Sequence, residues 1–176
     1  SHQALTDAVK ELDKSLNAEI LWWVLGHSRS TPDLDVASGL LEKEGEDDIL
    51  WGLRYLQRAP KPLTGDALKE ATEALAPHLK SSNDKIASLA LLAAGACGVR
   101  TETVETMIKS WFEDNDPKRR ACALLTIAGL TAPEPAQYKL EHFNWATKAL
   151  ADENWFVVSA ALECLRVIRL PSCPGL

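Results

Sequence analysis

The feature that most constrains the fold is a polar turn that recurs three times along the chain. Each copy ends an apolar helical stretch and contains an asparagine: Asn83, Asn115 and Asn154. The asparagines lie 32 and 39 positions apart, and the second interval contains a proline-bearing insertion at 131–135. Helical hairpins that recur at such an interval are typical of α-solenoids, in which each pair buries its apolar face against the next. We therefore expect a short right-handed α-solenoid.

Composition favours an all-α fold. Leu and Ala together supply 51 of the 176 residues, whereas Val and Ile supply 14. Leu and Ala lose little conformational entropy in helices, while β-branched side chains favour strands. No apolar run reaches the roughly 18 residues that a membrane-spanning helix needs, and the sequence shows no secretion signal. We expect a cytoplasmic protein without a membrane segment.

Apolar residues at helical spacing predict a series of helices. The expected ranges are 3–25, 31–43, 46–58, 64–80, 84–96, one that begins at Thr101, one that begins at Asp116 and Pro117, 139–151 and 154–169. In the helix that begins at Pro117, the residues expected to face the core are Ala121, Leu124, Leu125 and Ala128.

Two prolines, Pro60 and Pro62, form the clearest internal boundary. We therefore expect an N-terminal helical segment over 1–60, followed by helical repeats over 61–176. The two parts are expected to pack together as one domain.

One helix start resembles a known repeat family. The run DPKRRACALL, which begins at Asp116, resembles the second helix of a HEAT-type repeat. That helix opens with Asp-Pro and continues into a basic residue and pairs of small and apolar residues. Residues 154–165 and 83–92 are similar, but Trp155 and Lys85 stand where the proline would be.

The HEAT-like resemblance covers about 64–169 and implies antiparallel helix pairs. It implies architecture more than activity, because HEAT-like arrays serve many scaffolding roles. The family also includes DNA-alkylation repair glycosylases, which need a basic, aromatic-lined cleft with a catalytic acid. Trp111, Trp145 and Trp155 would supply aromatic rings, but residues 61–176 hold 14 acidic and 13 basic residues. This balance disfavours nucleic acid as a partner.

A shorter stretch, LNAEILWWVLGHSR at 16–29, resembles all-helical proteins of the bacterial GTPase-associated system. The shared elements are Glu, Leu-Trp-Trp, Gly and Ser, and they imply a non-catalytic partner in a multi-gene system. Because Trp and Arg are favoured in binding hot spots, we take four residues here as candidate partner-binding residues: Trp22, His27, Ser28 and Arg29. The alternative is that Trp22 and Trp23 both belong to the core.

No catalytic, cofactor-binding or metal-binding motif is recognisable. The four cysteines lack metal-ligand spacing, and we expect free thiols, of which Cys97, Cys122 and Cys164 fall in apolar helical patterns. The four histidines are scattered and show no HExxH spacing. The basic run 118–120 is open to two interpretations, a phosphate contact or a solvated turn beside acidic residues.

These observations leave three functions open. The repeats favour a non-catalytic adaptor or scaffold that binds a protein partner. Residues 1–60 hold 11 acidic and 6 basic residues, which suits an acidic antagonist, such as an immunity protein that masks a basic toxin surface. A HEAT-like nucleic-acid repair enzyme rests on fold analogy alone. The oligomeric state stays open.

Overall fold

The computed structural model of the chain describes residues 34–59, 62–131 and 140–168, which form eight α-helices and no β-strand. The helices are α3 (Leu34–Leu41), α4 (Glu46–Gln57), α5 (Gly65–Leu79), α6 (Asp84–Cys97), α7 (Glu102–Phe112), α8 (Pro117–Thr131), α9 (Leu140–Ala149) and α10 (Trp155–Val167). The all-α expectation is confirmed for this part of the chain. None of these helices is long and apolar enough to cross a bilayer. The division at residue 60 stays a prediction.

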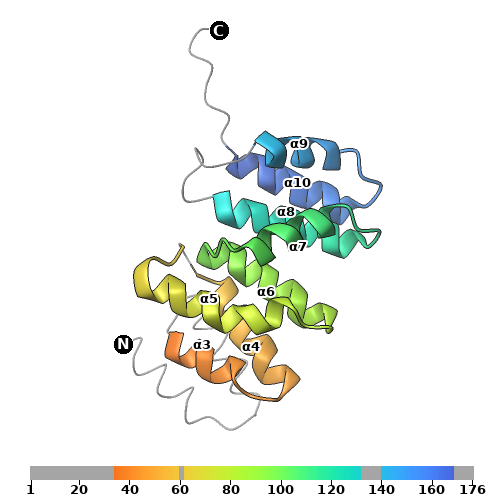
Figure 1. The fold of residues 1–176 in the computed structure, drawn as a ribbon. Coiled ribbons are helices and arrows are strands. Elements are labelled where there is room, and N and C mark those ends of the chain that lie inside the picture. The colour runs from red at the N-terminus through yellow and green to blue at the C-terminus, as the bar shows by residue number, and fades with distance from the viewer. Residues whose placement is uncertain (1–33, 60–61, 132–139, 169–176) are drawn as a thin grey trace.

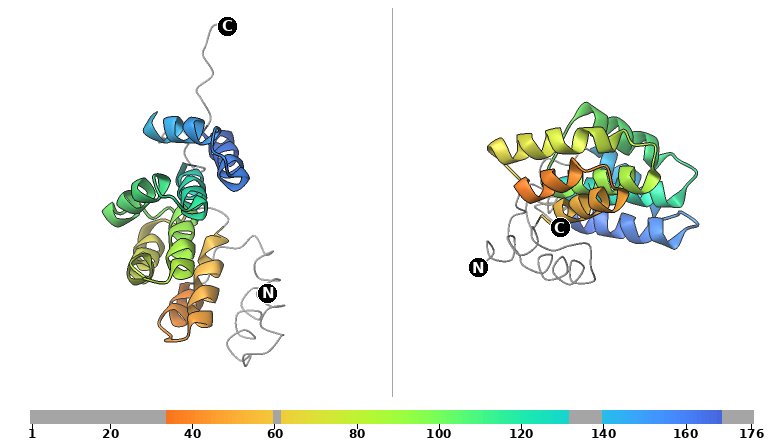
Figure 2. Two further views of the ribbon diagram at one scale, coloured as in Figure 1. Left: turned by 90° about the vertical axis from the view of Figure 1, so that its right-hand side faces the viewer. Right: turned by 90° about the horizontal axis from the view of Figure 1, so that it is seen from below.

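The helices pair along the chain and the pairs stack in order. The pairs α3–α4, α5–α6, α7–α8 and α9–α10 follow one another from one end of Figure 1 to the other. Within the stack, α4 contacts α6, α6 contacts α8 and α8 contacts α10. The left view of Figure 2 shows α5, α7 and α9 on one side of α6, α8 and α10. The described helices therefore form two layers, and the even-numbered helices connect the pairs.

Local signals explain where several helices begin and end. The side chains of Asn83 and Asn154 accept hydrogen bonds from backbone N–H groups in the first turns of α6 and α10, and Thr101 does the same for α7. These contacts satisfy N–H donors that have no partner within the helix. Gly98 ends α6 at φ 80°, a left-handed conformation that glycine adopts without steric cost.

The core lies between the two layers and between successive pairs. Its fully buried side chains include Leu53, Leu56, Leu75, Leu91, Ile108, Leu124 and Ile127. One inward prediction is wrong, because Leu125 is 39% exposed while its neighbour Thr126 is fully buried. The Thr126 hydroxyl lies 2.8 Å from the Cys122 carbonyl oxygen and 3.3 Å from that of Leu91 in α6. These backbone acceptors allow a polar side chain at the α6–α8 contact.

The predicted alignment of the three recurring turns is wrong by one residue at the turn before α8. In the turn before α8, the capping side chain is that of Asp116 rather than Asn115. Its carboxylate accepts a hydrogen bond from the backbone N–H of Lys118 in the first turn of the helix. It therefore corresponds to Asn83 and Asn154, and the true intervals are 33 and 38 positions. Aspartate and asparagine both place an oxygen where this cap needs one, so the three turns share a hydrogen-bond acceptor rather than a residue type.

Candidate protein-binding surface

The predicted partner-binding residues lie outside the part of the chain that the structure describes. They are Trp22, His27, Ser28 and Arg29. The choice between an exposed Trp22 and a core Trp22 therefore stays a prediction.

A groove of about 490 Å³ lies between the α5–α6 turn and α7. Its apolar lining includes Leu79, Met107 and Trp111, and its hydroxyl groups come from Ser81, Thr103, Thr106 and Ser110. The lining also carries two positive charges, from Lys80 and Arg119, and two negative charges, from Asp84 and Glu102. Such a mixed lining suits a polypeptide segment, which offers both apolar side chains and backbone hydrogen-bonding groups.

Arg119 holds the two sides of this groove together. Its guanidinium contacts Asp84 at the start of α6 at 2.6 Å and Asp114 in the α7–α8 turn at 2.8 Å. It also lies over the ring of Trp111 in α7, 5.5 Å from the centroid. The backbone N–H of Asp116 and the Arg119 side chain together lower the pKa of Asp114. Three of the lining side chains, Asp84, Trp111 and Arg119, are therefore held in place by contacts with one another.

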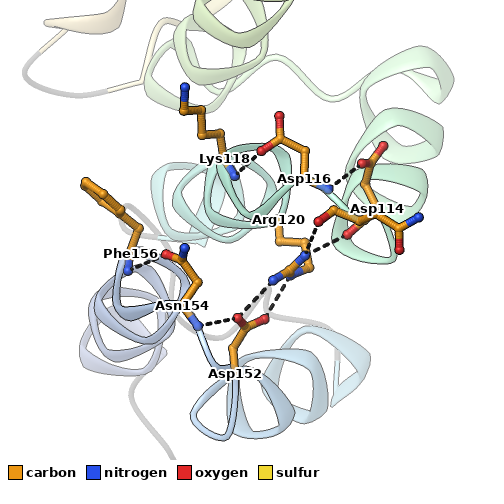
Figure 3. A network of polar contacts seen from close by, with 8 residues as sticks. Asp114, Asp116, Lys118, Arg120, Asp152, Asn154 and Phe156 are labelled. Carbon is orange, nitrogen blue, oxygen red and sulfur yellow. Dashed lines mark hydrogen bonds and ion pairs between the residues drawn. The ribbon is translucent and has the colours of Figure 1, made fainter.

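Arg120 makes the equivalent link to the following pair of helices (Figure 3). Its Nε and Nη2 atoms donate to both oxygens of Asp152, at 2.8 and 2.9 Å. Its Nη1 donates to the carbonyl oxygens of Asp114 and Asn115, at 2.9 and 3.0 Å. The Asp152 carboxylate also accepts the N–H of Asn154 at 2.9 Å. The hydrogen bond from Arg120 is the main reason that the pKa of Asp152 is lowered.

This geometry bears on the basic run at 118–120. Both guanidinium groups are paired with carboxylates of the neighbouring helical pairs, while Lys118 is exposed. Arg119 and Arg120 thus connect α5–α6, α7–α8 and α9–α10. We favour this structural role over a phosphate contact.

The three tryptophans that a repair-enzyme cleft would use lie in different surroundings. Trp111 is buried beside Arg119, whereas Trp145 of α9 stacks on Phe112 of α7 with ring centroids 5.0 Å apart. Trp155 is 67% exposed and stacks on Phe156. In the sequence, the feature that distinguishes Trp155 is its place at the first position of a helix, where α8 has Pro117.

The described cysteines are core residues, as expected. Cys97, Cys122 and Cys164 are free and buried, and burial raises the pKa of each thiol to about 12. At neutral pH these thiols are protonated and poorly nucleophilic. Among the described residues there is no group of three or more His, Cys, Asp or Glu side chains that could hold a metal ion.

Neither the models of known protein families nor the curated protein sequences match this chain.

Proposed function

We propose that this protein is a non-catalytic protein–protein interaction module, an adaptor or scaffold built as a short right-handed α-solenoid of HEAT-like helix pairs. The observation that carries the proposal is the groove between the α5–α6 turn and α7. Its lining combines apolar, hydroxyl and charged side chains, and Arg119 is held there by two carboxylates and a tryptophan ring. A surface held in this way loses little entropy when it binds a partner.

The stacking of the pairs supports the solenoid part of the proposal. The even-numbered helices contact one another in series, and the same capping geometry recurs at Asn83, Asp116 and Asn154. Repeat arrays of this kind present long surfaces on which protein segments bind. The occupant that fits the groove is a polypeptide segment with an apolar side chain for Met107 and Trp111 and polar groups for the surrounding hydroxyls.

The buried thiols support the remaining parts of the proposal. Their raised pKa values argue against thiol catalysis by Cys97, Cys122 or Cys164. Unpaired cysteines are also typical of a reducing compartment, so we propose the cytoplasm as its location. Membership of a bacterial GTPase-associated system rests on the resemblance of residues 16–29 and is part of the same proposal.

The test is affinity capture from cells of the source organism, followed by quantitative mass spectrometry and calorimetry with the purified partner. Thr106→Arg places a long charged side chain in the groove at an exposed position of α7. Thr147→Arg makes the same change at an exposed threonine of α9 that does not line the groove. We expect Thr106→Arg to abolish capture and Thr147→Arg to preserve it. Equal binding by both variants would remove the groove as the binding site.

A further inference from the structure

The last described helix leaves uncovered a face that is covered in the helices before it. Aligning the turns at Asn83, Asp116 and Asn154 places Leu91 of α6, Leu124 of α8 and Leu162 of α10 at one register position. Leu91 and Leu124 are fully buried, whereas Leu162 is 56% exposed. The α10 surface therefore corresponds to the contact surface that each earlier even-numbered helix offers to the next.

The contacts between α6 and α8 show which residues of an even-numbered helix lie against the next one. The sulfhydryl of Cys122 in α8 donates to the carbonyl oxygen of Ser88, and the hydroxyl of Thr126 to that of Leu91. A Cβ added at Gly95 would meet the backbone of Thr126 at 2.9 Å. Residues 88, 91 and 95 of α6 thus face α8, and their equivalents in α10 are Ser159, Leu162 and Arg166, all exposed.

The uncovered face has the composition of a contact surface. The α10 face consists of Trp155, Ser159, Leu162 and Arg166, which share one side of the helix because their spacing is four, three and four residues. Trp155 is 67% exposed. Terminal units of soluble repeat arrays normally present a polar outer face, so a large ring and a leucine on this face indicate that a further surface covers it.

The α10 face is complementary to itself. Positions 155 and 166, and positions 159 and 162, are symmetric about one midpoint of the helix. In an antiparallel pair of such helices, Trp155 of one lies opposite Arg166 of the other, and Ser159 lies opposite Leu162. A guanidinium over an indole ring is a favourable cation–π pair, and a small side chain leaves room for a large one.

We propose that the α10 face binds a second copy of this chain, with the two α10 helices packed antiparallel about a two-fold axis. Glu163 prepares Arg166 for this contact, because its carboxylate accepts two hydrogen bonds from the guanidinium at 2.6 and 2.8 Å. Such an isologous contact closes after two copies and does not extend into a filament. The contact would cover the α10 face as α8 covers the equivalent face of α6, but with the same face of a second copy rather than with the different face that α8 uses. It does not involve the α5–α7 groove and goes beyond the proposed adaptor function.

The small size of the α10 face predicts a weak dimer. One helix stripe is smaller than the roughly 800 Å² per partner of a standard protein–protein interface. We therefore expect a weak, reversible dimer with a dissociation constant in the micromolar range or above.

Sedimentation equilibrium of the full chain from low to several hundred micromolar tests the proposal. Leu162→Glu places an unpaired charge in the two-fold contact and is expected to raise the dissociation constant at least about tenfold. Leu125→Glu is the matched control, since Leu125 is an exposed leucine of α8 whose register equivalent in α10 is Glu163. This control is expected to leave the dissociation constant within about twofold of wild type. Circular dichroism melts verify that both variants fold.

The antiparallel register has its own test in a Cys173→Ser background. Chains with Ser159→Cys and chains with Leu162→Cys are mixed in equal amounts under mild oxidation. We expect mixed disulfides to form faster than either homodisulfide, because position 159 faces position 162 of the other copy. A wild-type chain that stays monomeric throughout, a Leu162→Glu chain that dimerises normally, or a mixture without preference for the mixed disulfide would each overturn the proposal.

Discussion

Gly129 of α8 lies directly against Gly95 of α6. A Cβ atom added at Gly129 would sit 2.8 Å from the carbonyl carbon of Gly95 and 3.0 Å from its oxygen. Both atoms belong to backbone inside a helix, so they cannot move aside as a flexible side chain could. The two glycines therefore permit the close approach of successive even-numbered helices.

This contact predicts that Gly129→Ala destabilises the protein although alanine is the better helix former. The added methyl has to push α6 and α8 apart, and we expect the free energy of unfolding to fall by about 1–3 kcal/mol. The measurement is urea denaturation followed by circular dichroism. Gly39 of α3 is the control, because a Cβ added there has no neighbour within 4 Å. Gly39→Ala should stabilise the protein by roughly 0.5–1 kcal/mol, and two changes of the same sign would contradict the close contact.

Removing the Arg120 side chain should cost more stability than removing an exposed arginine. Arg120→Ala leaves the Asp152 carboxylate, whose side chain is only 14% exposed, without its two charged hydrogen bonds. We expect a loss of about 2 kcal/mol in the free energy of unfolding. Arg166→Ala removes an exposed pair with Glu163, three residues away in the same helix, and should cost at most about 0.5 kcal/mol. Unfolding is measured with denaturant at a protein concentration well below the micromolar range. Both variants are then compared as monomers, and the proposed dimer contact of Arg166 does not contribute. Equal losses would mean that the Arg120 network does not connect the helical pairs.

The lowered pKa values of Asp114 and Asp152 predict a specific loss of stability in acid. A carboxyl group whose pKa is lower in the folded than in the unfolded protein stabilises the fold while it is ionised in both states. That contribution is fully present above the ordinary Asp pKa of about 4 and is lost as the pH falls towards the folded-state values.

Urea denaturation between pH 6 and pH 2.5 measures this effect. We expect the unfolding free energy of wild type to fall more steeply below about pH 4 than that of Asp152→Asn, which cannot titrate at this position. Asp66, an exposed residue in the first turn of α5, provides the control substitution Asp66→Asn. Parallel pH profiles for wild type and Asp152→Asn would contradict the assignment.

The buried thiols should resist modification in the native protein. Cys97, Cys122 and Cys164 combine burial with a pKa of about 12, so a thiol reagent at pH 8 meets neither an accessible nor an ionised sulfur. In a Cys173→Ser variant we expect no rapid reaction with dithionitrobenzoate. The same sample in guanidinium chloride should release three equivalents of thionitrobenzoate, matching its remaining cysteines. Rapid labelling of the native variant would show that one of these helices opens readily.

The helices α6 and α8 show that helix ends could be predicted from the sequence, whereas the buried face of α8 could be predicted only in part. The predicted helix over 84–96 and the start at Pro117 agree with α6 and α8, because the caps and Gly98 act within a few residues of the helix ends. The inward position of Leu125 was wrong because hydropathy favours leucine over Thr126 as a core residue. Thr126 is buried because the Leu91 and Cys122 carbonyl oxygens lie within reach of its hydroxyl, and Leu91 is 35 positions away.

The candidate groove could not be predicted in the same way. Arg119 contacts Asp84 across 35 positions, and Arg120 contacts Asp152 across 32. In the sequence these arginines were part of a basic run with nearby acidic residues, which left a phosphate contact and a solvated turn both open. The two longer-range partners become visible only when the helical pairs are stacked. The predicted residues at 22 and 27–29 lie outside the described part, and no contact tests them.

The sequence by itself determined that the described part of the chain is built from helices and approximately where each helix begins and ends. These properties depend on side-chain entropy, capping and apolar spacing over a few residues. Only the tertiary structure decided which faces are covered, because the offset between successive pairs places Gly129 on Gly95 and Arg120 on Asp152. That offset depends on backbone approach and on ion pairs between residues more than thirty positions apart. Leu124 is buried because α10 packs against α8, whereas Leu162, at the same register position, is exposed because no described helix follows α10.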